Sequence, residues 1–536
     1  MTTPHQSPTR TPDPTSASAG PSVPEGPAPK QRDQLADLPR WELVLVVATV
    51  SLGIGARLWP RGPLWLDEAL SVNLGRLPLS ELPGALKRDG HPPLYYELLH
   101  VWTGLLGTST FVVRALSIIT SLLGFPLVWL VARKAGGARV GMWAVAMWAV
   151  LPYGVRYATE TRMYILVMLL VLAGWWFLDR LWERPNWRDA AGLAAAGSLL
   201  LWMHYWSMWL LAAVGLAAAL RWWLNRGAEQ ANRELLVTGG ALGVAGLSFL
   251  PWVPTLLYQS ENTGTPWGIV ERPTTAVVIT LIDFAGRPSA EPQLMTYVLV
   301  FLVLVALVGR GRGGWAIVLE GPVRRGALWP LSLAGLTLLF GSLAAMVSGA
   351  TFVSRYAAVI YPMAVVLIGW GLASCPPRLR AVLGTVVLAG SAVGIALEIS
   401  SPRSLSGRAA DVIAAEAPDA LVVTCPDQLS VALSRELGPT HELVSYPDLS
   451  SDPRFVNWVD YAERVNAADP TAVAADVWRR AEGRPVVLGT SDTYDTHRLA
   501  CPAFEEALAD GHQPTDLLVA SGDDAFEHMS LVRFEP

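Results

Sequence analysis

Charged residues are scarce in this chain. They make up 16% of its 536 residues, whereas ordinary soluble domains carry about 25%. This shortage excludes a soluble globular protein. Apolar residues make up 52% of the chain and Trp occurs 23 times, which also excludes a disordered or fibrous protein. The composition indicates a polytopic α-helical membrane protein.

Cysteine is rarer still, with three residues in all, so a disulfide framework is excluded. Cys375 ends an apolar segment, whereas Cys425 and Cys501 lie in the C-terminal part of the chain. At most one bridge, between the last two, is available.

An apolar run is missing from the start of the chain. Residues 1–37 are rich in Pro, Ser, Thr and Ala, a composition that predicts a disordered tail. The first apolar run begins only at Trp41, too late for a cleaved secretory signal. We expect this run to be a retained first membrane helix.

Clustered basic residues on a soluble face are absent, which argues against nucleic-acid binding. Residues 400–536 carry 23 acidic and 10 basic residues, and the rest of the chain carries 22 acidic and 30 basic residues. The chain therefore divides into a cytoplasmic tail at 1–37, a membrane module at 38–399 and an acidic domain at 400–536.

Eleven segments are apolar enough to cross a bilayer, which takes about 20 residues. They are 41–59, 111–132, 140–157, 161–178, 190–206, 207–224, 235–258, 293–309, 327–348, 356–373 and 381–398. A twelfth, 94–107, either spans the membrane or lies at its surface. A surface helix leaves every short Arg-rich loop in the cytoplasm, as the positive-inside rule requires. We therefore expect a juxtamembrane helix at 94–107, a cytoplasmic N-terminus and an extracytoplasmic domain at 400–536.

The acidic domain is predicted to be a small α/β domain of unknown role. Short apolar runs predict strands, and helical patterns alternate with them. The strands are expected at 420–424, 442–445, 485–488 and 529–533, and the helices at 428–437, 470–482 and 502–510.

Polar residues gather on the external side of this topology, and ionisable residues at membrane depth usually mark functional sites. They are Asp67, Glu68, Asp89, His91, Glu160, Arg162, His204, Tyr205, Glu261, Asp283, Arg355 and Tyr356.

The strongest local signal is Leu-Trp-Leu-Asp67-Glu68, which is followed by Asp89-Gly-His91-Pro-Pro-Leu-Tyr-Tyr. Neighbouring helical residues point in different directions, so the two carboxylates cannot face one point equally. One can act as a general base while the other orients or binds. The plain alternatives are an acidic pair that stabilises a helix start and a double proline that forms a structural turn.

These segments resemble the polyprenyl-phosphate-sugar-dependent glycosyltransferases of the GT-C fold, especially protein O-mannosyltransferases and lipid A aminoarabinose transferases. The resemblance continues through Phe111-Val-Val-Arg114, Thr159-Glu160-Thr161-Arg162-Met163-Tyr164 and Ser354-Arg355-Tyr356. It covers residues 41–373 and leaves the acidic domain outside. The chain also lacks the luminal repeat domain of the eukaryotic O-mannosyltransferases.

The resemblance implies inverting transfer of a sugar from a polyprenyl-phosphate donor to an acceptor hydroxyl on the extracytoplasmic face. It implies that Asp67 is the general base and that Glu68 binds or orients. A departing phosphate also needs cations, because its charge grows as the glycosidic bond breaks. Arg114, Arg162 and Arg355 are the candidates.

Each candidate has an alternative role. Arg114 and Arg355 can instead extend to the lipid headgroups, and Arg162 is expected to pair with Glu160. Packing is the plainer role for His204, which lies between two Trp residues. The remaining predicted substrate-binding residues are Asp89, His91, Tyr164 and Tyr356.

The expected partners are the lipid-linked donor, membrane lipid, and a glycan, lipid or protein acceptor. The abundance of Ala, Gly and Arg favours a bacterial plasma membrane. We expect no cofactor and no obligatory metal, although Asp67, Glu68, Asp89 and His91 are potential ligands of a divalent ion. A multi-spanning transporter or lipid-linked sugar flippase is the main competing function, and a non-catalytic scaffold is a second.

Overall fold

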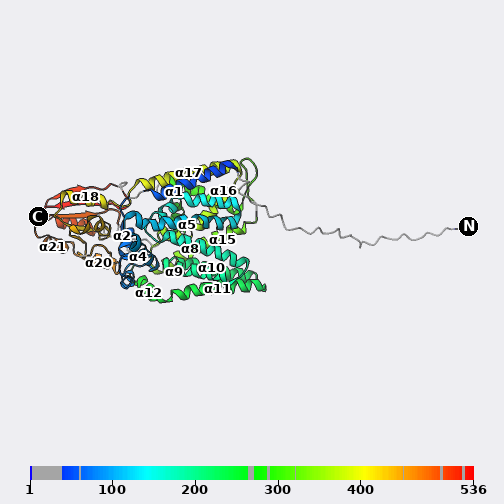
Figure 1. The fold of residues 1–536 in the computed structure, drawn as a ribbon, viewed down its shortest axis with the longest axis horizontal. Helices are drawn as coiled ribbons and strands as arrows, with labels where there is room; N and C mark the ends of the chain where they lie inside the picture. The colour runs from blue at the N-terminus through cyan, green and yellow to red at the C-terminus, as the bar shows by residue number, and fades with distance from the viewer. Residues whose placement is uncertain are drawn as a thin grey trace.

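The computed structural model describes residues 1–2, 39–59, 62–263, 271–286, 290–319, 321–450, 452–494, 499–521 and 525–536. Apart from its first two residues, the tail predicted at 1–37 lies outside these ranges. The described chain forms a bundle of long helices with a small mixed sheet at one end (Figure 1).

Within the described residues, the bundle is made of helices and one short hairpin. They are α1 (Arg40–Leu58), α2 (Leu66–Gly75), α3 (Leu82–Lys87), α4 (Leu94–Leu106), α5 (Thr110–Gly136), α6 (Ala138–Val150), α7 (Pro152–Ala158), α8 (Tyr164–Glu183), α9 (Trp187–Met203), α10 (Ser207–Leu224), α11 (Glu229–Phe249), η2 (Leu250–Trp252), α12 (Val253–Asn262), α13 (Pro273–Ala285), α14 (Ala290–Val308), α15 (Arg325–Ser348), η3 (Ser354–Val359), α16 (Tyr361–Ser374) and α17 (Pro377–Ser400). The hairpin is β1 (Gly309–Gly311) with β2 (Ile317–Leu319).

Seven helical stretches in the described part of the chain are long and apolar enough to cross a membrane. They are α1, α5, α8, α10, the stretch from α11 through α12, α15 and α17. The bent pair α6–α7 adds an eighth, and α13, α14 and α16 contain shorter apolar helices. The protein is therefore a polytopic helical membrane protein, while the count of eleven spans stays a prediction.

Three of the predicted spans begin or break differently in the structure. The segment 140–157 bends by 60° between α6 and α7, because Pro152 disfavours a helical conformation at Leu151, which is extended (φ −59°, ψ 126°). The segment predicted at 161–178 becomes helical only at Tyr164. The segment predicted at 356–373 starts as the 3₁₀ helix η3 and becomes α-helical at Tyr361.

Helix α4 occupies most of the segment 94–107, whose position decided the predicted topology. Its 13 residues extend for about 20 Å, less than the roughly 30 Å of a hydrocarbon core. Together with α2 it lies between the long helices and the sheet (Figure 1). This layer carries the strongest sequence signals.

The C-terminal part contains a five-stranded sheet in the order β4-β3-β5-β7-β6. Its elements are α18 (Ser406–Glu416), β3 (Leu421–Cys425), α19 (Gln428–Leu437), η4 (Gly438–Thr440), β4 (Leu443–Ser445), α20 (Tyr461–Ala467), α21 (Pro470–Ala481), β5 (Val486–Thr490), α22 (Ala500–Ala509), β6 (Pro514–Leu518) and β7 (Ser530–Phe534). Strands β3, β4 and β5 are parallel, and β7 runs antiparallel to both β5 and β6.

Four of the five strands lie where the sequence predicted them, and β6 was missed. It begins at Pro514 and is mostly exposed, which is typical of an edge strand, so its sequence lacks the apolar pattern of its neighbours. A disulfide joins Cys425 at the end of β3 to Cys501 in α22, whereas Cys375 is a buried free thiol.

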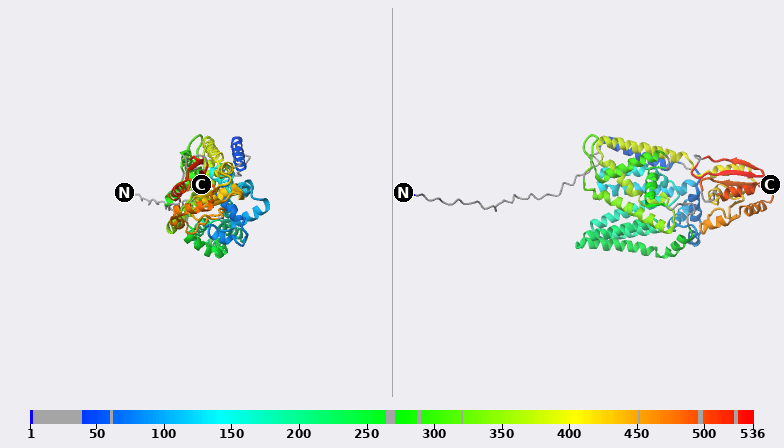
Figure 2. Two further views of the ribbon diagram at one scale, coloured as in Figure 1. Left: turned by 90° about the vertical axis from the view of Figure 1, so that its left-hand side faces the viewer. Right: turned by 180° about the vertical axis from the view of Figure 1, so that it is seen from behind.

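The sheet end of the molecule rests on the layer that contains α2, α3 and α4 (Figure 2). The backbone N–H of Trp458 donates to the carbonyl of Arg88, and that of Asp460 donates to the carbonyl of Asn262. Helix α19 packs against α2. The C-terminal part therefore covers the residues that the sequence singled out.

Candidate functional site

Helix α2 carries the acidic pair in its first turn. The preceding residue, Trp65, is extended and supplies no capping side chain, since an indole can only donate a hydrogen bond. The pair therefore lies at the positive end of a helix, where carboxylates are stabilised. As expected from the helical geometry, Asp67 and Glu68 face different partners.

Glu68 is completely buried and is committed to an ion cluster. Arg114 at the start of α5 donates to both of its oxygens, from Nε to Oε1 at 2.8 Å and from Nη2 to Oε2 at 2.5 Å. The backbone N–H of Thr161 donates to Oε1 at 2.9 Å, and Nη1 of Arg403 lies 3.5 Å from it. Glu68 therefore joins α2, α5, the 159–163 turn and the C-terminal part.

Asp67 differs because its side chain keeps 14% of its surface exposed. Nη1 of Arg355 donates to Oδ2 of Asp67 at 2.9 Å, and Nε of Arg162 lies 3.8 Å from the same oxygen. Two arginines from distant parts of the chain thus hold the one accessible carboxylate of the pair.

Arg162 connects Asp67 to the His-Pro-Pro segment. It donates to Oγ of Ser71 at 3.1 Å and to Nε2 of His91 at 3.0 Å. A guanidinium can only donate, so Nε2 of His91 is the acceptor and Nδ1 carries the proton toward Asp89 (2.8 Å). Tyr96 donates to the same Asp89 oxygen at 3.1 Å.

Glu160 does not pair with Arg162, so that expectation was wrong. Its Oε2 lies 3.4 Å from Nη1 of Arg403 and 3.8 Å from Nε of Arg156. The 159–163 segment is a turn rather than a helix, and its backbone carries the Glu160 and Arg162 side chains to different partners.

The pKa values of two buried carboxylates of the site, Glu68 and Glu160, are shifted in opposite directions. Burial alone would raise the pKa of Glu68, but Arg114, Arg403 and the Thr161 amide together hold it below its usual value. Burial raises the pKa of Glu160 above its ordinary value despite the partial compensation by Arg403 and Arg156. Glu160 is therefore the better proton holder of the two.

An aromatic group flanks the charged residues. The ring of Tyr164 lies 5.7 Å from that of His204, which in turn lies 5.5 Å from that of Tyr356. Nδ1 of His204 accepts from the backbone N–H of Trp206 at 3.2 Å, and Tyr356 stacks on the Trp206 ring. His204 is thus packed among rings, and its role in substrate binding stays a prediction.

All eleven predicted site residues lie in this one region, but other polar residues of the external set do not join it. Tyr205 donates to Gln259, Glu261 is exposed, and Asp283 lines a separate pocket. Arg114 is 3% exposed and bound to Glu68, which excludes its extension to lipid headgroups in this structure.

Sequence reasoning missed the contributions of Arg403, Tyr494 and Glu527 from the C-terminal part. Oε1 of Glu527 accepts from the backbone N–H of Leu66 at 3.0 Å and from Tyr494 at 2.6 Å. No local pattern marks Glu527. Arg403 was detectable only as a basic residue close to the predicted boundary at 399.

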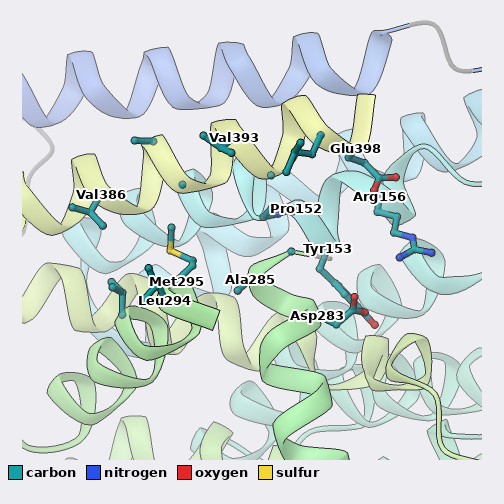
Figure 3. A pocket seen from close by; sticks show the side chains of 16 residues that line it. Pro152, Tyr153, Arg156, Asp283, Ala285, Leu294, Met295, Val386, Val393 and Glu398 are labelled. Atoms are coloured by element: carbon teal, nitrogen blue, oxygen red, sulfur yellow. The ribbon is translucent and has the colours of Figure 1, made fainter. Parts of the chain in front are cut away.

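An apolar pocket of about 420 Å³ opens beside the site between α7, α13, α14 and α17. Arg156, Asp283 and Glu398 lie at one end of it and Val386, Leu294 and Met295 toward the other (Figure 3). Tyr153 lines the pocket and donates to the carbonyls of Ser354 and Arg355 at 3.0 and 3.3 Å. The pocket wall is therefore attached to the segment that presents Arg355.

Within the described ranges, no three His, Cys, Asp or Glu side chains converge as metal ligands. The four potential ligands that the sequence offered are instead engaged with Arg355, Arg114, Arg162 and one another. The absence of an obligatory metal stays a prediction.

Comparison of the sequence with known proteins gives two findings. The family described as Dolichyl-phosphate-mannose-protein mannosyltransferase matches residues 90–252, a stretch that includes His91, Arg114 and Arg162 but not Asp67 or Arg355. No curated protein sequence matches the chain significantly.

The crystal structure of ArnT from Cupriavidus metallidurans in the apo state superposes with a TM-score of 0.55 at 14% identity, covering 92% of this chain and 98% of that one. The same protein bound to undecaprenyl phosphate gives a TM-score of 0.52 with the same identity and coverage. The similarity thus extends into the C-terminal part, which the sequence resemblance had left outside. The chain has the GT-C fold, as its sequence motifs indicated.

Proposed function

We propose that this protein is a membrane glycosyltransferase that moves a sugar from a polyprenyl-phosphate donor to an acceptor hydroxyl, with Asp67 as the general base. The observation that carries the proposal is the state of Asp67. It is a partly exposed carboxylate, held by Arg355 and Arg162, beside a Glu68 that is fully buried and fully paired. Such an arrangement separates the reactive carboxylate from the structural one.

The reaction follows from this separation. Asp67 takes the proton of the acceptor hydroxyl, whose oxygen then attacks the anomeric carbon of the sugar. The bond from that carbon to the phosphate oxygen breaks, and the polyprenyl phosphate leaves with the bonding electrons. One displacement inverts the anomeric centre, and the proton stays on Asp67 until it passes to solvent.

Arg355 and Arg162 suit the departing phosphate. Arg355 donates one N–H to Asp67 and keeps 24% of its side chain exposed. Its guanidinium can therefore bind a phosphate oxygen while it remains beside the base. Charge-assisted hydrogen bonds of this kind strengthen as negative charge grows on the leaving group.

The apolar pocket between α7 and α17 is our candidate for part of the prenyl chain. Its charged end lies beside the site through the Arg156–Glu160 pair (3.8 Å), and its other walls are apolar (Figure 3). ArnT, which shares the fold, has been crystallised with undecaprenyl phosphate, and this supports a lipid-phosphate donor here.

This pocket assignment can be tested with Val393→Trp, which would fill the pocket from α17. Val382→Trp is the matched control, since Val382 is 46% exposed on the same helix but outside the pocket. We expect the first variant to raise the donor KM at unchanged kcat, as expected when only ground-state binding is lost, and the control to behave like the wild type. Equal donor KM values in all three proteins would contradict the assignment.

We also propose that the site faces the outside of a bacterial plasma membrane. Glu42, Arg139 and Arg380 meet at the end of the bundle opposite the site. Arg133 follows Arg114 along α5, about 28 Å farther from the site. The positive-inside rule places this basic end in the cytoplasm. The disulfide in the C-terminal part supports an oxidising, external compartment for the other end.

Asn225→Cys and Asn457→Cys test this orientation in intact cells. Both positions are exposed, the first between α10 and α11 and the second in the C-terminal part. An impermeant thiol reagent should label only the second. Labelling of Asn225→Cys from outside would show that the orientation is the reverse of the proposed one.

The central experiment uses the purified protein in lipid with a labelled polyprenyl-phosphate sugar and a panel of acceptors. Wild type should transfer label and Asp67→Asn should not, while Glu97→Gln, an exposed carboxylate on α4, should transfer normally. Label that crosses the bilayer without being transferred would favour a transporter or flippase. Full transfer by Asp67→Asn would exclude Asp67 as the base.

A further inference from the structure

The start of α2 is not capped by its own sequence. The first N–H groups of any helix lack intrahelical acceptors, and a Ser, Thr, Asp or Asn side chain usually supplies one. Here the N-cap is Trp65, which makes no side-chain cap. The acceptor for the N–H of Leu66 is instead Oε1 of Glu527 at 3.0 Å. A residue from the far end of the chain thus caps the helix that bears Asp67.

Glu527 is itself held in place by the C-terminal part. Ser404 donates from Oγ to its Oε2 at 2.6 Å, and Tyr494 donates to its Oε1 at 2.6 Å. Its backbone N–H donates to the carbonyl of Arg403 at 2.9 Å, and its carbonyl accepts from the N–H of Leu405 at 3.2 Å. The side chain is fully buried, so it has a single orientation, aimed at α2.

The placement matters because Leu66 directly precedes Asp67. A rotation of the first turn by one residue would swing Asp67 away from Arg355 and expose Glu68 in its place, since neighbouring helical side chains point about 100° apart. The capping bond resists this rotation. Arg403, which follows α17, adds a second link by lying 3.5 Å from Glu68.

We propose that Glu527 is a positioning residue of the transfer site, which fixes the first turn of α2 and thereby sets the orientations of Asp67 and Glu68. The expected fall in kcat rests on the proposed function, whereas the capping of α2 does not. It also gives the C-terminal part a role, namely completing the site within the same chain.

The amide variant provides a matched control. Either a carboxylate or a neutral carboxylic acid can accept from Leu66, and burial raises the pKa of Glu527 to about 7. Glu527→Gln keeps an oxygen for Leu66 and gains an N–H for Ser404, so it should preserve the cap. Glu527→Ala removes the acceptor altogether. Glu535→Ala, at an exposed position near the C-terminus, controls for loss of a carboxylate.

The experiment measures both hydrogen exchange and kinetics on the full-length protein in lipid. In Glu527→Ala, peptides covering residues 66–70 should exchange about tenfold faster, and kcat should fall about tenfold, as expected for the loss of one hydrogen bond of ordinary strength. The donor KM should stay unchanged. Glu527→Gln and Glu535→Ala should match the wild type in all three measurements.

Unchanged exchange at residues 66–70 in Glu527→Ala would overturn the inference, and so would faster exchange with unchanged kcat. If Glu527→Ala fails to fold, Tyr494→Phe and Ser404→Ala loosen Glu527 more gently and should give smaller effects of the same sign. Wild-type kinetics and exchange in both would equally overturn it. A wild-type protein that transfers no sugar overturns the proposed function instead, and exchange in α2 then still decides whether Glu527 caps the helix.

Discussion

Buried carboxylate–arginine clusters occur at both ends of the helical bundle, and they differ in whether one of their carboxylates is accessible. At the end away from the sheet, Glu42 of α1 is fully buried and pairs with Arg380 (2.5 Å) and Arg139 (3.4 Å). At the sheet end, Asp67 and Glu68 meet four arginines from distant segments. Residue types alone do not distinguish the two clusters.

The remaining N–H groups of Arg380 donate to backbone carbonyls. They donate to the carbonyls of Leu372 (3.0 Å), Ala373 (3.2 Å) and Cys375 (2.6 Å), which are at the C-terminal end of α16. The last carbonyls of a helix need such partners. This cluster therefore fastens α1, α16 and α17 together around a carboxylate that is fully buried.

Arg355 makes fewer hydrogen bonds than Arg380. It makes one hydrogen bond to Asp67, and its Nε is buried without a hydrogen-bond partner within the described part of the chain. Nε of Arg139 in the other cluster is also buried without a hydrogen-bond partner within the described residues, so an unused donor does not distinguish the two ends. The partly exposed carboxylate of Asp67 does distinguish them, because Glu42 is fully buried.

The largest effect is expected for Asp67→Asn. An amide still accepts a hydrogen bond from Arg355, but it cannot take the proton from the hydroxyl of the acceptor substrate. The rate of sugar transfer should therefore fall by about 10²–10⁴-fold. Steady-state transfer at saturating donor measures this loss. Thermal unfolding of the variant should match that of the wild type, and a matching loss of folded protein would instead assign Asp67 a structural role.

Glu42→Ala should lower the folding stability without changing the rate of sugar transfer. It leaves the buried Arg380 and Arg139 charges without their carboxylate, which costs about 3–5 kcal/mol of folding free energy when a buried pair is broken. Thermal denaturation in detergent measures the change, and transfer per folded molecule should stay constant. Reduced transfer by protein that remains folded would show that the two clusters are coupled.

A smaller, purely kinetic effect is expected for Arg355→Met. Hydrogen bonds to charged groups contribute about 1.5–3 kcal/mol, so kcat/KM for the donor should fall by roughly ten- to 150-fold. Arg378→Met, at an exposed position at the start of α17, is the control and should retain full activity. Equal transfer by both variants would show that Arg355 does not bind the departing phosphate.

The smallest effect concerns pH. Burial raises the pKa of Glu527 from its ordinary 4.5 to about 7, although Ser404, Tyr494 and the Leu66 amide counteract part of this shift. The folded protein therefore binds this proton more tightly than the unfolded chain. The resulting stabilisation is fully present below pH 4.5 and is lost as the pH rises through 7, by less than about 1.4 kcal/mol per pH unit.

Thermal midpoints of the wild type and Glu527→Gln, measured from pH 5 to 8, isolate this contribution. The nearby charged group is Asp67, whose negative charge also favours the protonated form of Glu527. The wild-type midpoint should fall with pH more steeply than that of the variant. Parallel curves would show that Glu527 does not titrate in this range.

Several parts of the site were predictable because their signals are local. Asp67, Glu68 and His91 stand in short, recognisable segments, and helical geometry alone indicated that the two carboxylates of the acidic pair face different partners. The pairing of Arg162 was predicted wrongly, because proximity to Glu160 in sequence suggested a contact that the turn at 159–163 prevents. The role of His204 stays a prediction, although its ring packs against Tyr164 and Tyr356.

The break between α6 and α7 and the late start of α8 show where apolar patterning fails. A hydropathy window averages over Pro152 and over the polar turn before Tyr164, so it reports continuous spans. The backbone conformation at Leu151 and the bond from the Thr161 amide to Glu68 decide the actual ends.

The sequence by itself determined that this is a helical membrane protein and that acids, histidine and arginines gather at one end, and the resemblance carried by its short motifs implied the GT-C fold. These properties follow from composition and short motifs, which need no knowledge of distant contacts. Only the tertiary structure decided which carboxylate is left accessible, and that Arg403 and Glu527 complete the site. Leu66 and Glu527 meet across nearly the whole chain, and no local pattern encodes such a contact, because it exists only once both parts have folded against each other.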